Sequence, residues 1–142
     1  MAVFSDTFSV PTTRTLEWIA ITPQVAAIVQ ESGLEAGIAC VTTRHTTAAV
    51  LLNEFQESLM ADLQALGERL VPSQEMYRHN DSRYSDCERG NAQAHLRAAL
   101  LGSGITLSIA QGGMVLGRHQ SIIFVEFDGP RTRQISVHLI GE

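Results

Sequence analysis

The hydrophobic positions of the chain alternate between a spacing typical of strands and one typical of helices. Residues 4–10 and 15–21 are rich in β-branched and aromatic side chains, and with Pro11 between them they predict a hairpin-like pair of strands. Residues 37–43 predict a buried strand. The continuous apolar run within residues 46–54 does not separate a strand from a helix by periodicity, and we favour a strand.

Three segments show helical spacing. Thr22 can cap a helix that has Pro23 at its first position and ends before Gly33. A second helix ends before Pro72, and its apolar stripe is expected to face the core. The residues of this stripe are Leu59, Leu63, Leu66 and Leu70. Asn91 can cap a third helix, which ends near residue 102 and carries His95 one turn from Asn91 on the same side.

The last forty or so residues favour strands separated by glycine-containing turns. Residues 105–110, 114–117, 121–127 and 134–140 are strand-like, and together they predict an antiparallel meander. The order of strands and helices indicates an α+β fold rather than a doubly wound parallel sheet. The length of 142 residues is typical of one domain, spanning residues 1–142.

Composition narrows the functional classes. The formal net charge of -5 gives a nucleic-acid backbone no broad attraction, so we expect no nucleic-acid partner. No apolar run approaches the length needed to span a bilayer, and residues 1–10 lack the basic start of a signal peptide. We therefore expect a cytoplasmic protein without a membrane partner. Lysine is absent, so every basic residue other than histidine is arginine, which suits bidentate capture of carboxylate or phosphate.

Three of the five histidines stand among polar or small residues. His45, His79 and His95 come from different predicted elements, and if they converge they could hold Zn²⁺ or a similar divalent ion with one position open. The spacing matches no compact ligand motif, and surface or helix-packing histidines are the alternative. His138 alternates outward from a predicted strand, and we assign it no function.

Carboxylates and arginines supply further candidates. Glu54 and Asp81 are the acidic residues best placed to orient the imidazoles or to move a proton, although a solvated or capping role is the alternative for each. Arg131 and Arg133 flank a rigid turn and could bind phosphate, unless they simply coat a hairpin end. Glycine-rich nucleotide loops and a GxSxG elbow are missing from the sequence, which disfavours dinucleotide binding and serine hydrolysis.

Five segments, in order, resemble the YjbQ-type family of secondary thiamine-phosphate synthases, and the similarity covers nearly the whole chain. These segments are His45-Thr46-Thr47-Ala48-Ala49, Asn53-Glu54, His79-Asn80-Asp81, Gly90-Asn91-Ala92-Gln93-Ala94-His95-Leu96 and Glu126-Phe127-Asp128-Gly129-Pro130-Arg131-Thr132-Arg133. One departure concerns residues 117–120, which read Gly-Arg-His-Gln where family members commonly have Gly-Thr-Trp-Gln. The imidazole of His119 thus replaces a tryptophan that could stack on the ring of a ligand, while Gln120 is kept.

The resemblance implies a largely antiparallel β-sandwich with two to three flanking helices, assembled as a homotrimer. It also implies a histidine-held divalent metal ion (Zn or Mg) and an activity that joins a pyrimidine methyl diphosphate to a thiazole phosphate. On this basis we expect a catalytic set, a set that binds a small phosphorylated substrate, and a metal set. The catalytic set is His45, Glu54, Asp81 and Asn91; the substrate set is Gln120, Arg131 and Arg133; the metal set is His45, His79 and His95.

Three hypotheses follow for the function. The first is a transferase in which the metal and Arg131 or Arg133 neutralise a leaving diphosphate. The second is a metal-dependent hydrolase of a small phosphorylated metabolite, which uses a metal-activated water at the same pocket. The third is a non-catalytic trimer that binds a metal ion or a small anion.

Overall fold

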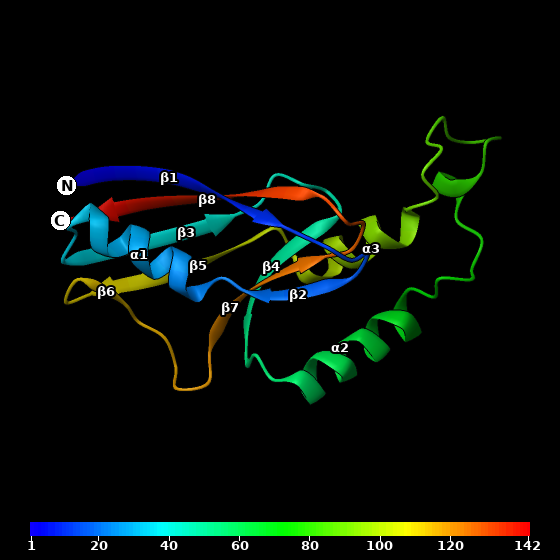
Figure 1. Ribbon diagram of the computed structural model, residues 1–142. Helices are drawn as coiled ribbons and strands as arrows, with labels where there is room; N and C mark the ends of the chain where they lie inside the picture. Colours follow the sequence, from blue (N-terminus) through cyan, green and yellow to red (C-terminus); the bar gives the residue numbers. More distant parts are fainter.

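The computed structural model describes residues 1–142 and contains two antiparallel sheets, three α-helices and one short 3₁₀ turn (Figure 1). Sheet A has the strand order β1 (Ala2–Pro11), β8 (Thr132–Gly141), β3 (Ala36–Thr42), β5 (Gly104–Ala110) and β6 (Gly113–Met114). Sheet B has the order β2 (Glu17–Ala20), β7 (Ser121–Glu126) and β4 (Ala48–Asn53). The helices are α1 (Thr22–Ser32), α2 (Glu57–Leu70) and α3 (Ala92–Leu101), and η1 is Arg78–Asn80.

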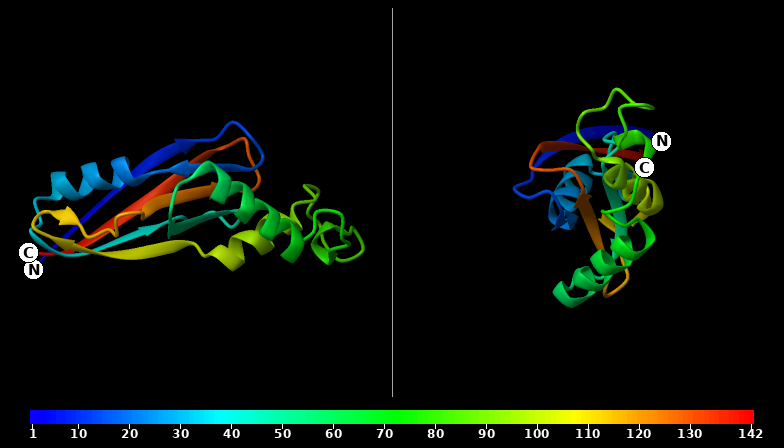
Figure 2. Two further views of the ribbon diagram at one scale, coloured as in Figure 1. Left: turned by 90° about the horizontal axis from the view of Figure 1, so that it is seen from below. Right: turned by 90° about the vertical axis from the view of Figure 1, so that its right-hand side faces the viewer.

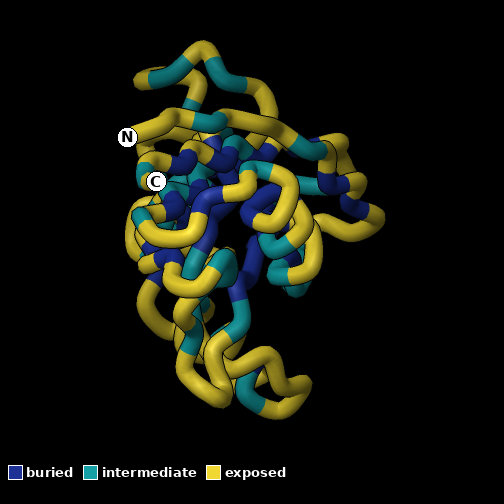
Figure 3. Tube along the Cα trace, turned by 90° about the vertical axis from the view of Figure 1, so that its left-hand side faces the viewer, coloured by how far each residue is buried: buried dark blue, intermediate teal, exposed yellow.

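Sheet B is the middle layer of the molecule. One of its faces packs with α1 against sheet A around Val50, Phe124 and Val137, and the other packs against α2 and α3 around Met60 and Val125. The buried residues, drawn dark blue in Figure 3, accordingly gather in the interior of the molecule. Because both faces of β4 and β7 are buried, their sequences are continuous apolar runs without alternation. The predicted strand within residues 46–54 is confirmed, as is the α+β sandwich with flanking helices.

The strand pairing differs from the predicted hairpin and meander. β1 pairs with β8 along its whole length, whereas β2 pairs with β7 in the other sheet, so residues 4–10 and 15–21 are not partners. Likewise β7 lies between β2 and β4, and β8 lies between β1 and β3. Of the predicted meander, β5 and β6 do pair antiparallel. The other predicted pairings were wrong because local turns report where strands end, while strand partners are chosen by the faces that the two sheets bury against each other.

The helices lie close to their predicted positions. α1 begins at Thr22 and ends at Gly33, whose φ of 68° is the left-handed conformation that glycine adopts without steric cost. Leu66 and Leu70 of α2 are 41% and 62% exposed, so only part of the predicted stripe reaches the core. None of the three helices is long and apolar enough to cross a membrane.

A buried ion pair joins the two sheets at one end of the sandwich. Arg133 of β8 donates from Nε to Oε2 of Glu126 at 2.7 Å and from Nη2 to the Thr47 hydroxyl at 2.8 Å. Thr12 donates from its hydroxyl to Oε2 of Glu126 at 3.0 Å. The side chains of Arg133 and Glu126 are 2% and 0% exposed, so these bonds replace the water that both charges have lost.

The segment between α2 and α3 projects from the end of the molecule that lies opposite to both termini (Figures 1 and 2). It contains η1 and is otherwise irregular. Its anchor is the amide side chain of Asn80, whose Oδ1 accepts from the backbone N–H of Ala92 at 2.9 Å. Asn80 therefore caps α3, a role that the sequence had assigned to Asn91.

Candidate functional site

The three predicted site histidines form a contiguous set beside α3. His45, from the loop between β3 and β4, and His95 of α3 line the same depression. The rings of His95 and His79 meet edge to face, with centroids 4.8 Å apart. We call the hollow the histidine depression; its polar lining residues are Thr43, Arg44, His45, Thr46, His95 and Ser103. The remaining lining residues are small, and no carboxylate lines the hollow.

Asn91 holds the ring of His79 through a chain of hydrogen bonds. Its Nδ2 donates to Oδ2 of Asp128 at 2.9 Å, which directs its Oδ1 toward Nε2 of His79 at 3.2 Å. Because Oδ1 can only accept, Nε2 of His79 carries the hydrogen and Nδ1 keeps a lone pair. His95, packed against that ring, makes no hydrogen bond to another protein group, so its nitrogens are free for a ligand in the depression.

Asp128 is the anionic end of this chain. Nε and Nη2 of Arg89 donate to the two carboxylate oxygens of Asp128, each at 3.0 Å. Nη2 of Arg131 lies 3.6 Å from Oδ2 of Asp128. Burial alone would raise the pKa of Asp128, but the hydrogen bonds from Arg89 and Asn91 outweigh it and hold the pKa below its ordinary value. Asp128 is therefore ionised at neutral pH and fixes the orientation of Asn91.

The lowered pKa of Asp128 predicts a dependence of stability on pH. An aspartate in the unfolded chain has a pKa of about 3.9, so the stabilisation from Asp128 is complete above that pH and is lost as the pH falls through its lower folded value. Urea unfolding between about pH 6 and 2 should therefore show a shallower loss of stability for Asp128→Asn than for the unmodified chain. Equal slopes for the two proteins would contradict this role of Asp128.

His45 is neutral and partly engaged. Its Nε2 accepts from the backbone N–H of Gln134 at 3.0 Å, which leaves Nδ1 protonated as a donor. Burial, together with the positive charge of Arg133, lowers the pKa of His45 below its usual value. Burial is the larger of these causes, and Glu126 of the buried ion pair partly offsets the effect of Arg133 on the pKa of His45.

Several predicted site residues lie apart from the histidines or are already engaged. Glu54 follows β4 and approaches only His119, at 3.9 Å, while Gln120 accepts from the backbone N–H of Gly117 at 2.8 Å and closes its own loop. Asp81 pairs with Arg83 in the projecting segment. Within one chain these residues therefore do not join the histidine depression.

The two predicted phosphate-binding arginines differ in accessibility. Arg133 is 2% exposed and its guanidinium is committed to Glu126 and Thr47, so its structural role replaces the predicted ligand role. The side chain of Arg131 is 39% exposed at the edge of the Asp128 cluster, where it can still meet an anion.

The predicted metal set does not form a ligand cluster in one chain. No three His, Cys, Asp or Glu side chains are arranged to hold a metal ion. The hydrogen bonds explain this, since Nε2 of His45 is taken by Gln134 and Nε2 of His79 by Asn91. The residues present therefore do not fit the predicted ion, and a divalent cofactor stays a prediction.

The predicted sets lack several members of the site, including Thr43 and Thr46 of the depression. Arg44 and Ser103 line the depression, and Asp128 terminates the hydrogen-bond chain. Asp128 stood in the sequence only within the segment of residues 126–133 and in none of the predicted site sets. The available signal was its position beside two arginines in residues 128–133, a pattern that favours a fixed carboxylate as much as an exposed loop.

Fold and site together define a class: small two-sheet α+β proteins with a histidine-lined depression beside a helix. The family model described as UPF0047 protein YjbQ-like matches residues 6–142, and the chain belongs to this family. A UPF0047 protein from Methanothermobacter thermautotrophicus is 39% identical over 142 residues, covering 100% of this chain and 95% of that protein. UPF0047 protein YugU from Bacillus subtilis is 34% identical, with coverage of 95% and 98%.

Solved structures agree with the fold. A YbjQ-like protein of unknown function from Sulfolobus solfataricus superposes with a TM-score of 0.91 and 37% identity, and covers 99% of each chain. A hypothetical protein from Aeropyrum pernix gives a TM-score of 0.88 and 32% identity, covering 98% of this chain and 99% of that one. These values extend the family relationship to the full architecture.

The predicted thiamine-phosphate synthase activity is wrong. The family model and the relatives are described as UPF0047 proteins and the Sulfolobus structure as a protein of unknown function, so none of these descriptions supports the predicted activity. The metal group on which that mechanism depended is also not formed. The metal-dependent alternatives lose their support for the same reason.

Proposed function

We propose that the chain binds a small phosphorylated metabolite in the histidine depression and abstracts a proton from it with His95. The main support for this proposal is the set of side chains that line the depression. Arg44 supplies a positive charge, Thr46 and Ser103 supply hydroxyl groups, and no carboxylate opposes an anion there although the chain has a net charge of -5. Phosphate, with its many acceptor oxygens, suits this set of donors.

His95 is suited to the proton transfer because its ring nitrogens have no protein partner. His79 is a positioning residue, since its ring, fixed by Asn91, packs against that of His95 at 4.8 Å. A neutral imidazole is an efficient general base for removing a proton from carbon next to a carbonyl group. The proton passes from carbon to the imidazole and exchanges with solvent before it returns.

Binding is tested first, with inorganic phosphate as the probe in a calorimetric titration. Arg44→Gln should weaken binding by about 10- to 100-fold, the usual worth of a hydrogen bond to a charged group. Arg14→Gln is the matched control, because Arg14 is exposed in the turn between β1 and β2 and does not line the depression. Equal weakening in both variants, or no binding to the unmodified chain, would contradict the proposal.

Proton abstraction is tested with a panel of phosphorylated aldehydes and ketones in heavy water, followed by proton NMR. The unmodified chain should exchange the hydrogen next to the carbonyl in at least one compound, and His95→Gln should slow this by about 100-fold or more. His119→Gln is the control, because the side chain of His119 is 70% exposed and does not line the depression. Full activity in His95→Gln would reject this base.

A homotrimer, located in the cytoplasm, is part of the same proposal. The face of sheet A turned away from the core carries no charged residue on β8, β3 or β5, although charged residues make up 18% of the chain. This uncharged face includes Ser5, Cys40, Thr106, Ser136 and His138. Depletion of charge is the compositional mark of an interface core.

The oligomeric state gives a direct test of this face. Light scattering should report three copies for the unmodified chain and a single copy for Thr106→Arg, because an arginine buried without a partner is costly. Ser58→Arg, on exposed α2, should leave the trimer intact. A single copy for the unmodified chain would contradict the proposal.

A further inference from the structure

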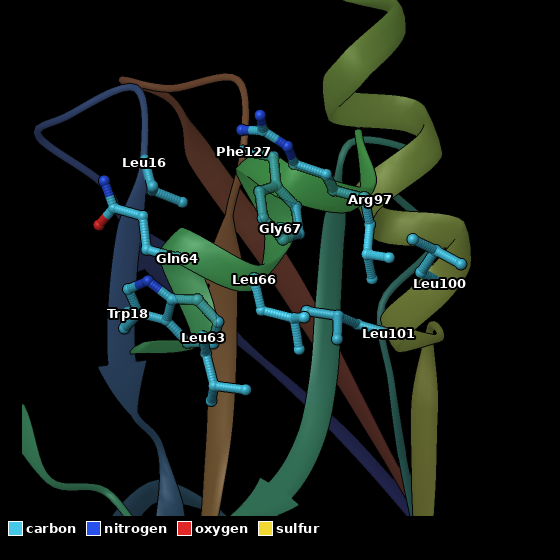
Figure 4. A pocket seen from close by; sticks show the side chains of 11 residues that line it. Leu16, Trp18, Leu63, Gln64, Leu66, Gly67, Arg97, Leu100, Leu101 and Phe127 are labelled. Carbon is cyan, nitrogen blue, oxygen red and sulfur yellow. The ribbon is translucent and has the colours of Figure 1, made fainter. Parts of the chain in front are cut away.

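A second hollow lies on the other side of α3 and has different chemistry. α3 turns His95, Ala98 and Ala99 toward the histidine depression, and turns Arg97, Leu100 and Leu101 toward a groove beneath α2. Eight of the eleven residues that line this groove are hydrophobic. Figure 4 shows Leu16, Trp18, Leu63, Leu66 and Phe127 around it, and we call it the leucine groove.

The helices on either side of the leucine groove leave apolar surface uncovered. Met60 is the one buried residue of α2. Leu66, Leu70 and Leu100 are 41%, 62% and 63% exposed although all three line the groove. Contiguous exposed apolar surface of this kind marks a binding site, because covering it gains free energy in proportion to its area.

A glycine keeps the groove open. Gly67 lies within α2, where glycine costs about 1 kcal/mol relative to alanine. A Cβ placed on Gly67 would touch only the side chain of Arg97, at 3.9 Å, which is an ordinary contact. Packing inside the chain therefore does not require glycine here. The missing side chain leaves room in the groove that a guest molecule can fill.

The buried polar atoms at the groove indicate the chemistry of such a guest. Nε1 of Trp18 and Nε of Arg97 are both buried without an acceptor, and both are donors. Nη2 of Arg97 is fixed by Glu68, Ser73 and the carbonyl of Val71, so the guanidinium is held in place over the groove. Buried donors normally have acceptors, and no carboxylate lines this groove to provide one.

We propose that the leucine groove binds a small amphipathic carboxylate of the medium-chain fatty-acid class. The acyl chain contacts the leucines and the open face of Gly67, and the carboxylate accepts from Arg97 or Trp18. A carboxylate satisfies donors that the fold leaves unpaired, and an apolar tail covers the exposed leucines. The site is separate from the histidine depression and does not depend on the function proposed for it.

The sole tryptophan of the chain reports on the groove, since Trp18 lines it. Titration with decanoate should give a saturable change in Trp18 fluorescence, and decylamine, a cation of equal length, should give none. Gly67→Leu fills the groove and should weaken decanoate binding by about tenfold or more. Asp62→Ala, which changes α2 away from the groove, should bind decanoate as the unmodified chain does.

Leu100→Glu provides a second variant that keeps the fold, because Leu100 is 63% exposed and tolerates a polar side chain. Its carboxylate should repel decanoate and abolish the fluorescence change. Absence of a saturable change in the unmodified chain would overturn the proposal, as would equal binding of decylamine or full binding by Gly67→Leu. Trp18 fluorescence that depends on protein concentration but not on decanoate would overturn it too, by showing that a second copy covers the groove.

Discussion

Replacing Arg133 by methionine is expected to lower the free energy of unfolding by about 3–5 kcal/mol, the usual cost of leaving one buried charge unpaired. Glu126, at 0% exposure, would lose its hydrogen bonds to the guanidinium and keep only those from Thr12 and the backbone of Asp128. Burial raises the pKa of Glu126, but the bonds from Arg133 and its neighbours outweigh that effect and keep the carboxylate ionised. Without Arg133 the buried carboxylate loses its main stabilising partner. Urea unfolding measures the loss.

The ion pair between Arg83 and Asp81 is the matched control. It has the same chemistry, but Arg83 is 70% exposed, so Arg83→Met should cost less than about 1 kcal/mol. Combining Arg133→Met with Glu126→Leu should recover much of the stability, because no buried charge is left unpaired. A loss below about 1 kcal/mol for Arg133→Met alone would show that the pair does not have the structural role assigned to it.

Gly129→Ala is expected to destabilise the fold by about 3 kcal/mol or more, because the new methyl group has no room. A Cβ on Gly129 would lie 2.3 Å from the carbonyl oxygen of Arg14 and 2.8 Å from both the Cγ of Glu126 and the hydroxyl of Thr12. One of these contacts is backbone, so the strain cannot be relieved by a side-chain rotation. The turn would shift, and Asp128 and the hydrogen-bond chain to His79 would move with it.

Gly113→Ala serves as the control for the effect of adding a methyl group to glycine. A Cβ on Gly113 would approach only the carbonyl oxygen of Ala110, at 4.0 Å, and the change should fall within about 0.5 kcal/mol. Thermal unfolding of the two variants side by side separates local crowding from the general effect of alanine. Similar midpoints for Gly129→Ala and Gly113→Ala would contradict the packing described around residues 126–131.

Local signals predicted the helices well but misled the strand pairing. Pro23 and Gly33 mark the two ends of α1 in the sequence and in the structure, because their backbone conformations suit those positions. The predicted cap is wrong, since Thr22 is the first residue of α1 and its hydroxyl accepts from the backbone N–H of Ile122. The partner of β1, by contrast, is β8, more than 120 residues away in the chain at their closest pair. No turn residue reports such a pairing, since it follows from burying one face of sheet A against sheet B.

The candidate site was likewise only partly predictable, because the sequence shows local neighbours and not long-range contacts. Polar or small neighbours in the sequence pointed to His45, His79 and His95. The sequence could not show which ring nitrogens are already used. Nε2 of His45 accepts from the backbone N–H of Gln134. Almost every residue has such a backbone donor, so the side-chain pattern of the sequence cannot indicate this bond.

The most direct measurement of the proposed site is the NMR of all five histidine rings during a titration with inorganic phosphate. Phosphate should move the ring signals of His95 and His45, which line the depression, while His79 keeps its hydrogen on Nε2 because Asn91 holds it there. His119 and His138, which lie outside the depression, should not respond. Equal shifts in all five rings, or none at His95, would contradict an anion site beside α3.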